Sequence, residues 1–248
     1  MINPFSLNGK TVLVTGASSG IGRQTAVTIS GMGGTVMITG RNEDRLAETF
    51  RMLEGEGHRS FAAALTDSAQ RAALADTAQA LDGIVHCAGI TKLVPFQYLT
   101  EKHLNEVWRA NYEAAVLLTQ TLLKKKRIVT GGSIVFIAST AGLLGAKAIT
   151  AYSASKAALI ATSRVLALEV ASQRIRSNCL APALVETPMA AETAERVSAE
   201  TFAENLKLYP LGFGKPDDVA NAAVFLLSDA SRWITGATLV LDGGCTIQ

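Results

Sequence analysis

Short apolar runs alternate along the chain with longer segments in which apolar positions recur every three or four residues. The short runs are rich in β-branched residues and predict strands, whereas the longer segments have the spacing of amphipathic helices. The predicted strands cover residues 11–15, 35–39, 60–65, 83–88, 133–139, 175–181 and 237–242, and the predicted helices cover 21–32, 42–55, 68–80, 101–124, 151–172, 198–208 and 217–228. This alternation predicts an α/β, doubly wound fold, with a seven-stranded parallel sheet covered by helices on both faces.

No shift in composition and no linker divides the 248 residues, so we expect a single domain over residues 1–248. Signals at two helix starts agree with the predicted boundaries. Asp67 is placed to cap the helix over 68–80, with Gln70 reaching back to it. Pro216 is placed in the first turn of the last helix.

Charge and cysteine content exclude several classes of protein. The net charge of +2 is too small to indicate a nucleic-acid-binding face. The basic run over 124–127 follows an apolar helical segment, and we expect it at a helix C-terminus, with a docking patch for an acidic partner as the alternative. The three cysteines form no CxxC pair and lie in apolar or glycine-rich segments, so we expect buried free thiols and no metal site.

The pattern of apolar residues also bears on location and assembly. No uninterrupted apolar run approaches membrane-spanning length, and the first residues lack the pattern of a secretory signal, so we expect a cytoplasmic protein that does not bind membranes. The segments 101–124 and 151–172 are apolar around much of their circumference. Because such helices need cover on more than one side, we expect a homo-oligomer, either a dimer or a tetramer.

A glycine-rich turn joins the first predicted strand to the first predicted helix. Gly16, Gly20 and Gly22 allow a tight turn and a close approach of the backbone and the helix N-terminus to a pyrophosphate. Ser18 and Ser19 can donate hydroxyl groups to the same ligand. A glycine-rich turn alone is equally compatible with a purely structural role, but its position in a βαβ chain favours phosphate binding.

A tyrosine and a lysine stand four residues apart in the segment "YSASK". If the segment is helical, Tyr152 and Lys156 lie on one face, and only small residues separate them. An isolated tyrosine and lysine with this spacing are usually surface residues without a catalytic role. The other motifs therefore have to distinguish surface residues from a catalytic pair.

The glycine turn and the tyrosine–lysine pair together indicate a known protein family. The chain resembles the short-chain dehydrogenase/reductase family end to end and is similar to its compact β-ketoacyl-carrier-protein-reductase-like members. The matching segments are "TGASSGIG" (15–22), "HCAG" (86–89), Asn111, "IAST" (137–140), "YSASK" (152–156), "APALVET" (181–187) and "GATLVLDGG" (236–244). The resemblance implies a Rossmann fold that binds NADP(H).

The resemblance also implies roles for individual residues. Tyr152 would be the general acid/base, and Lys156 would lower its pKa while holding the nicotinamide ribose. Ser139 would orient the substrate oxygen, and Asn111 would hold a water that links Lys156 to solvent. The residues expected to bind the cofactor are Gly16, Ser18, Ser19, Gly20, Ile21, Gly22, Arg41, Asn42, Leu65, Cys87, Ala88, Gly89, Tyr152, Lys156, Pro182, Val185 and Thr187.

Four positions depart from the family pattern. Ala64 replaces an aspartate that contacts adenine, and Ala183 replaces a glycine near the nicotinamide. His86 and Cys87 replace two asparagines. We expect His86 to be a packed histidine with one satisfied nitrogen rather than a catalytic group, and Cys87 to present its backbone to the adenosine.

Cofactor choice and substrate depend on two further segments. Enzymes that prefer NAD place a carboxylate at the end of the second strand, where this chain has Gly40 followed by Arg41, so we expect NADP(H). Residues 188–215 correspond to the substrate-covering lid. The expected activity is hydride transfer on a carbonyl/alcohol pair, with 3-oxoacyl thioesters competing against small keto-acids, sugars and cyclic ketones. A non-catalytic dinucleotide sensor is the alternative of another class.

Overall fold

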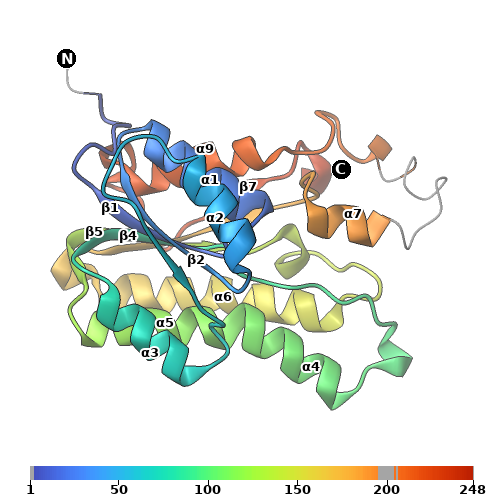
Figure 1. Cartoon of the computed structure of the whole chain (residues 1–248). Coiled ribbons are helices and arrows are strands. Elements are labelled where there is room, and N and C mark those ends of the chain that lie inside the picture. The colour runs from blue at the N-terminus through green and yellow to red at the C-terminus, as the bar shows by residue number, and fades with distance from the viewer. Residues whose placement is uncertain (1–2, 195–203, 205, 248) are drawn as a thin grey trace.

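Seven parallel strands form one sheet at the centre of the molecule, in the order β3-β2-β1-β4-β5-β6-β7 (Figure 1). The structure is a computed structural model that describes residues 3–194, 204 and 206–247. The strands are β1 (Thr11–Thr15), β2 (Thr35–Gly40), β3 (Arg59–Ala62), β4 (Leu81–His86), β5 (Ile128–Ile137), β6 (Arg176–Pro182) and β7 (Thr238–Leu241). The chain proceeds from β1 outward to β3 and then returns to place β4 on the other side of β1. The carboxyl ends of β1 and β4 therefore border the crevice where ligands bind in sheets of this kind.

Helices cover both faces of the sheet, as predicted. The helices are α1 (Gly20–Gly31), α2 (Glu43–Arg51), α3 (Ser68–Thr77), α4 (Glu101–Trp108), α5 (Ala114–Lys124), α6 (Thr150–Glu169), α7 (Pro188–Ala194) and α9 (Pro216–Leu227). One apolar core packs α1, α2 and α9 against the sheet, and a second core packs α3, α5 and α6 against the opposite face (Figure 1). The prediction of a doubly wound, seven-stranded parallel sheet is confirmed.

The predicted helix over 101–124 is interrupted. A single π-helical turn, Arg109–Glu113, separates α4 from α5. A π-turn adds one residue to a helical turn, and such bulges are frequent at functional positions. The apolar spacing on either side continues the same stripe, so the sequence does not reveal the inserted residue.

Several predicted strand boundaries differ from the structure, and the two largest differences are in β5 and β3. β5 begins at Ile128 rather than at 133, because the register with β4 shifts between Leu81 and Gly83 and the extra residues include Gly131 at φ +85°. β3 ends at Ala62 rather than at 65. The predicted helix over 198–208 falls largely outside the described residues.

The start of α3 explains why β3 is short. Asp67 caps α3 as predicted, since its Oδ1 accepts from the Gln70 N–H at 2.9 Å. The Gln70 side chain does not reach back to Asp67; instead its Oε1 accepts from the Ala64 N–H at 2.7 Å. That bond turns the chain away from the sheet. Pro216 begins α9 as predicted.

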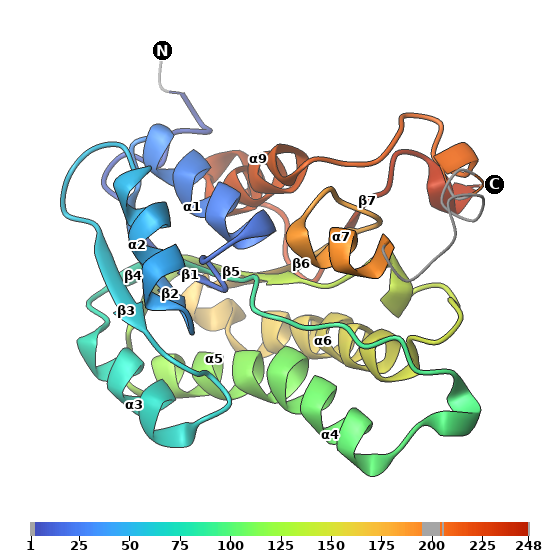
Figure 2. The ribbon, with the colours of Figure 1, turned by 45° about the vertical axis from the view of Figure 1, so that its right-hand side comes forward.

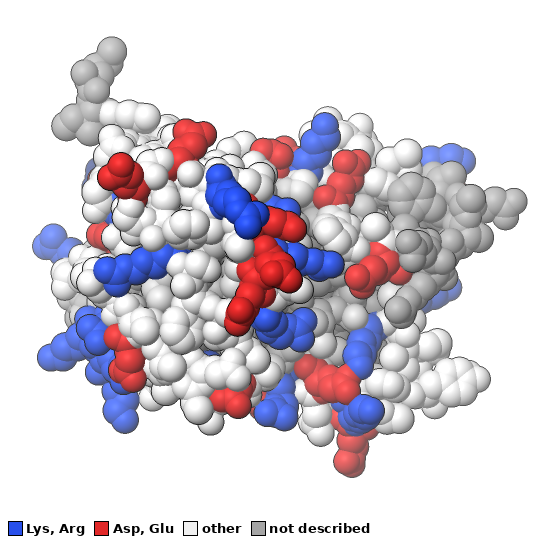
Figure 3. Space-filling model, viewed as in Figure 1, with Lys and Arg blue, Asp and Glu red and all other residues white. Residues whose placement is uncertain are grey.

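The basic run lies where the sequence predicted it, at the end of α5 (Figure 3). Lys125 pairs with Asp76, and the Arg127 carbonyl accepts from the Leu81 N–H at the amino end of β4. The run is therefore at the edge of the sheet opposite the ligand crevice.

The three cysteines are free, and of these Cys179 is buried whereas Cys87 and Cys245 are partly exposed. Among the described residues, no helix has the length and apolar character needed to cross a membrane. Apolar side chains are exposed along α6, where Val165 is 56% and Leu168 is 81% exposed. The predicted homo-oligomer, which would cover this face, stays a prediction.

Candidate active site

The glycine turn between β1 and α1 packs closely on itself and on the end of β4. Gly16 has φ +65°, and a Cβ there would stand 2.7 Å from the Ala88 backbone. A Cβ on Gly22 would stand 2.3 Å from the Gly16 carbonyl oxygen. The side chain of Ser19, the N-cap of α1, makes no capping bond. The first N–H groups of α1 thus face a site that suits a phosphate.

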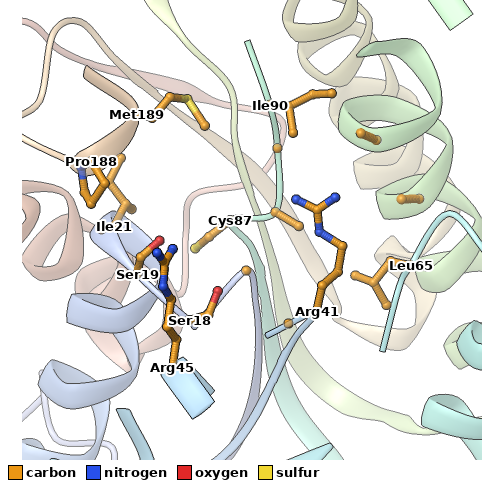
Figure 4. Close-up of a pocket in the computed structure, with 18 of the residues that line it drawn as sticks. Ser18, Ser19, Ile21, Arg41, Arg45, Leu65, Cys87, Ile90, Pro188 and Met189 are labelled. Carbon is orange, nitrogen blue, oxygen red and sulfur yellow. The ribbon is translucent and has the colours of Figure 1, made fainter. Parts of the chain in front are cut away.

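A pocket opens directly beside this turn, at the carboxyl ends of β1, β2 and β4 (Figure 4). Most of the predicted cofactor residues line it, namely Gly16, Ser18, Ser19, Gly20, Ile21, Gly22, Arg41, Leu65, Cys87, Ala88, Gly89 and Thr187. Among the described residues that line it, Arg41 and Arg45 are the charged ones, and none is an aspartate or a glutamate. A helix N-terminus and two cations in a glycine-cradled pocket fit a ligand with several phosphates.

Five predicted cofactor residues lie outside the lining, namely Asn42, Pro182, Val185, Tyr152 and Lys156. Asn42 is committed to structure, because it caps α2 by accepting from the Arg45 N–H at 2.8 Å. Pro182 ends β6, and Val185 is buried and forms a bridge to Gly214. Asn42 Oδ1 is thus occupied as a helix cap, and the binding of the cofactor by Asn42 stays a prediction.

Gly89 connects the pocket to the remaining candidate groups. A Cβ at Gly89 would stand 3.2 Å from Asn111 Oδ1 and 3.6 Å from Lys156 Nζ. Neither Tyr152 nor Lys156 lines the pocket itself, so both stand just beyond its wall. Figure 2 shows the start of α6 and α7 at the same end of the molecule, with the connection from β4 to α4 passing between them. The glycine turn and the Tyr-Lys pair belong to one continuous site.

Tyr152 and Ser139 meet in this site. Ser139 follows β5 and caps a short 3₁₀ turn by accepting from the Ala141 N–H at 3.1 Å. Burial raises the pKa of Tyr152, and a hydrogen bond with Ser139 partly offsets that rise. Tyr152 therefore holds its proton at neutral pH.

Lys156 lies on the same face of α6, one turn after Tyr152. Its Nζ is 5.5 Å from the centre of the Tyr152 ring and donates to the Ile137 carbonyl at 2.7 Å. Burial lowers the pKa of Lys156 to about 8. The expected lowering of the Tyr152 pKa by Lys156 is not seen. The Lys156 ammonium donates to the Ile137 carbonyl, and burial of the phenol is the largest effect on the Tyr152 pKa.

Asn111 lies within the π-turn and is buried. Its Oδ1 accepts from the Ile90 N–H at 2.8 Å, and its Nδ2 donates to the Ile90 carbonyl at 3.0 Å and to Ser155 Oγ at 3.1 Å. Both amide donors are occupied, so the side chain could bind the expected water only through the remaining acceptor capacity of Oδ1. Asn111 ties the start of the β4–α4 connection to α6.

His86 is packed as the sequence predicted. Its Nε2 bonds to Thr119 Oγ1 at 2.7 Å, and its ring stacks on Phe136 with centroids 4.9 Å apart. Burial lowers the pKa of His86 to about 3. The ring therefore stays neutral at physiological pH.

Cys87 follows His86 at the end of β4. The Cys87 N–H donates to Thr15 Oγ1 at 3.2 Å, which fixes the backbone against β1. Although Cys87 is partly exposed as a residue, burial of its thiol raises the thiol pKa to about 12, which keeps it protonated.

Several lining residues were missed from the sequence. They are Gly40, Arg45, Ala63, Thr66, Ile90, Ala110, Ala114, Pro188 and Met189. Most are small or apolar and carry no chemical signal, and Ala64, which the family pattern singled out, lies outside the lining. Arg45 was detectable, because it stands four residues after Arg41, next to the predicted start of a helix.

Comparisons with known proteins agree with this site. Residues 16–246 match the family model described as "Enoyl-(Acyl carrier protein) reductase". The chain is 35% identical to D-threitol dehydrogenase of Mycolicibacterium smegmatis, covering 98% of this chain and 95% of the relative. It is 36% identical to the 3-oxoacyl-[acyl-carrier-protein] reductase FabG of Chlamydia pneumoniae, covering 98% and 99%.

A solved structure extends the likeness to the fold. The putative NAD(P)-dependent gluconate 5-dehydrogenase of Beutenbergia cavernae, which has bound NADP, is 34% identical and superposes with a TM-score of 0.88, covering 99% of this chain and all of that one. The chain thus belongs to the short-chain dehydrogenase/reductase family of oxidoreductases, which bind a nicotinamide cofactor and act on CH–OH and carbonyl groups.

Proposed function

We propose that this protein reduces a carbonyl group with NADPH and that Tyr152 donates the proton. The observation that carries the proposal is the position of Gly89, with the phosphate-binding pocket on one side and Asn111 and Lys156 on the other. A dinucleotide whose phosphates lie at the glycine turn would extend past Gly89 toward Tyr152. NADPH, when bound, supplies the hydride.

The proton comes from the chain itself. Burial keeps Tyr152 protonated, which suits a donor to the oxygen of a carbonyl that is being reduced. Ser139, hydrogen-bonded to Tyr152, is placed to bind the same oxygen and orient it. In the opposite direction Tyr152 would first have to lose its proton, which its raised pKa disfavours, so its protonated state suits reduction.

Lys156 and Asn111 position these groups. Lys156 is within reach of a ligand that passes Gly89, where it would hold ribose hydroxyls as a cation below its pKa of about 8. Asn111 holds the Ile90 backbone and Ser155 in place. Loss of either would displace the reacting groups rather than remove the proton donor.

The charge of the pocket supports NADPH over NADH. Gly40 ends β2 where a carboxylate would contact the ribose, and a Cβ there would stand 3.3 Å from Ser18 Oγ. Arg41 follows directly and lines the pocket. A guanidinium next to a strand end that carries no carboxylate suits a 2′-phosphate.

Exposed apolar side chains that follow Ser139 in the chain support 3-oxoacyl thioesters as substrates. Leu143 and Leu144, shortly after Ser139, are 45% and 49% exposed, and Met189 of α7 lines the pocket. An apolar flank suits an acyl chain better than a sugar or a small keto-acid. The basic run at the end of α5 is at the opposite edge of the sheet, so a carrier protein that delivers substrate would have to dock elsewhere.

Replacing Arg41 with alanine is expected to weaken NADPH binding by roughly 10- to 100-fold, because one hydrogen bond to a charged group contributes roughly 1.5–3 kcal/mol. NADH binding should change little, since NADH lacks the 2′-phosphate. Fluorescence titration of both reduced cofactors measures the two affinities. Equal losses for both would show that Arg41 does not bind the 2′-phosphate.

A panel of 3-oxoacyl thioesters, keto-acids, keto-sugars and cyclic ketones, followed by the absorbance of NADPH, tests the proposed function. We expect turnover of the 3-oxoacyl thioesters. Turnover confined to sugars or keto-acids would keep the protein an NADPH-dependent reductase but would replace its proposed substrate. Tight NADPH binding without turnover of any member would favour the dinucleotide sensor.

A further inference from the structure

We propose that Arg45 is a second residue that binds the 2′-phosphate of NADPH and shares the selection of the cofactor with Arg41. The inference rests on the proposed use of NADPH and names the groups that would enforce it. Arg45 lies in the first turns of α2, and its side chain lines the same pocket as Arg41.

The two guanidinium groups approach the pocket from different positions. Figure 4 shows Arg45 extending along Ser18 and Ser19, and Arg41 on the side of Cys87 and Leu65. The side chains of Arg41 and Arg45 both extend toward the open part of the pocket. A group held at the corner between Gly40 and Ser18 would thus have a cation on each side.

The backbone that carries Arg45 is held in place. Its N–H donates to Asn42 Oδ1 at 2.8 Å, and its carbonyl accepts from Arg23 Nη2 at 3.3 Å. Arg23 also donates to the Ser18 carbonyl at 2.9 Å, which ties the start of α2 to the glycine turn. The position of the Arg45 backbone relative to the phosphate site is therefore fixed by bonds that do not involve its guanidinium.

Nearby acidic groups do not neutralise Arg45. Glu48, one turn further along α2, pairs with Arg23 at 2.9 Å. Glu43 and Asp44, in the first turn of α2, lie outside the pocket lining. Within the described residues, neither Arg41 nor Arg45 forms an ion pair with a carboxylate. Two uncompensated cations facing one pocket repel each other unless an anion lies between them.

The chemistry of the site favours the 2′-phosphate over the pyrophosphate as this anion. The pyrophosphate is served by Gly20, Gly22 and the N-terminus of α1. Arg45 instead belongs to the element that follows β2, whose end faces the adenosine ribose in sheets of this kind. A phosphate dianion can accept hydrogen bonds from two guanidinium groups at once.

The test compares Arg45→Ala, Arg41→Ala and the double variant with Arg51→Ala. Arg51 is an exposed arginine in the last turn of the same helix, outside the pocket, so its variant carries the same change of net charge. Affinities are measured by calorimetry for adenosine 2′,5′-bisphosphate and adenosine 5′-monophosphate, which differ only in the 2′-phosphate, and by fluorescence for NADPH and NADH. Alanine favours helix, so α2 should persist in each variant.

We expect Arg45→Ala to weaken binding of NADPH and of the bisphosphate by roughly 5- to 20-fold, below the full range for a charged hydrogen bond because Arg41 still binds the 2′-phosphate. NADH, the monophosphate and the Arg51→Ala control should change little. Arg41→Ala should keep part of the preference for NADPH, and the double variant should lose it.

Three results would overturn the assignment, and they are distinguishable. If the wild type prefers NADPH but Arg45→Ala behaves like Arg51→Ala, Arg45 has no role and the proposed function stands. If Arg45→Ala weakens NADPH and NADH equally, Arg45 binds another part of the cofactor. If the wild type shows no preference for NADPH, the proposed cofactor itself is wrong, and the role of Arg45 fails with it.

Discussion

Replacing Tyr152 with phenylalanine is expected to lower kcat/KM by roughly 10²- to 10⁴-fold, the range that general acid catalysis contributes. Phenylalanine fills the same buried space, so the affinity for NADPH should stay near that of the wild type. The variant removes the proton donor and the hydrogen bond between Tyr152 and Ser139. Steady-state kinetics and a cofactor titration on the same preparation separate the two effects.

Tyr112→Phe is the matched control for this experiment. The Tyr112 hydroxyl bonds to Thr162 at 3.0 Å rather than to Ser139, so its removal deletes a tyrosine hydroxyl outside the site. Its kcat/KM should stay within a few-fold of the wild type. Turnover by Tyr152→Phe at the level of Tyr112→Phe would remove Tyr152 from its proposed role.

Replacing Lys156 with methionine should reduce both turnover and cofactor binding, unlike Tyr152→Phe. Methionine keeps an unbranched apolar side chain but loses the ammonium, which donates to the Ile137 carbonyl and stands next to Gly89. We expect kcat/KM to fall by about 10²-fold or more, since the ribose loses its donor and the nicotinamide is no longer held beside Tyr152. Lys147→Met, which removes an exposed lysine ahead of α6, should have little effect. A Lys156→Met variant that binds NADPH as tightly as the wild type would contradict the assigned contact.

The lowered pKa of Lys156 also predicts a pH dependence. With a pKa of about 8, Lys156 is a cation below pH 8 and neutral above it, so wild-type affinity for NADPH should fall as the pH rises through 8. The nearby thiols of Cys87 and Cys179 stay neutral there, because burial raises their pKa values to about 12 and about 11. The affinity of Lys156→Met for NADPH should not fall over this pH range. A wild-type affinity that stays constant between about pH 7 and pH 9 would exclude this role of the Lys156 charge.

The fold was predictable because each predicted segment carried a local signal. Alternating strands and helices imply a parallel sheet, and the helix starts at Asp67 and Pro216 were marked by capping residues. The errors arose where tertiary contacts override such signals. Gln70 bonds to Ala64 rather than to its own helix, and the register shift beside Gly83 lengthens β5.

The site was predictable from residue types at family spacing, but its electrostatics were not. The sequence suggests that Lys156 lowers the pKa of Tyr152, whereas in the fold the ammonium is bound to Ile137 and burial raises that pKa. The π-turn that carries Asn111 leaves no trace in the apolar pattern. Arg45 lines the same pocket as Arg41 because α2 begins at Glu43 and its first turns bring the Arg45 side chain to the pocket.

Isotope transfer tests the central claim most directly, namely that this chain passes a hydride from NADPH to a carbonyl carbon. The wild type is incubated with a 3-oxoacyl thioester and NADPH dideuterated at C4 of the nicotinamide, and the product is analysed by mass spectrometry and NMR. We predict one deuterium on the new carbinol carbon for each NADP⁺ formed, with product formation strongly reduced in Tyr152→Phe. A product that carries no deuterium, or NADPH that is bound but not consumed with any carbonyl of the panel, would contradict the account.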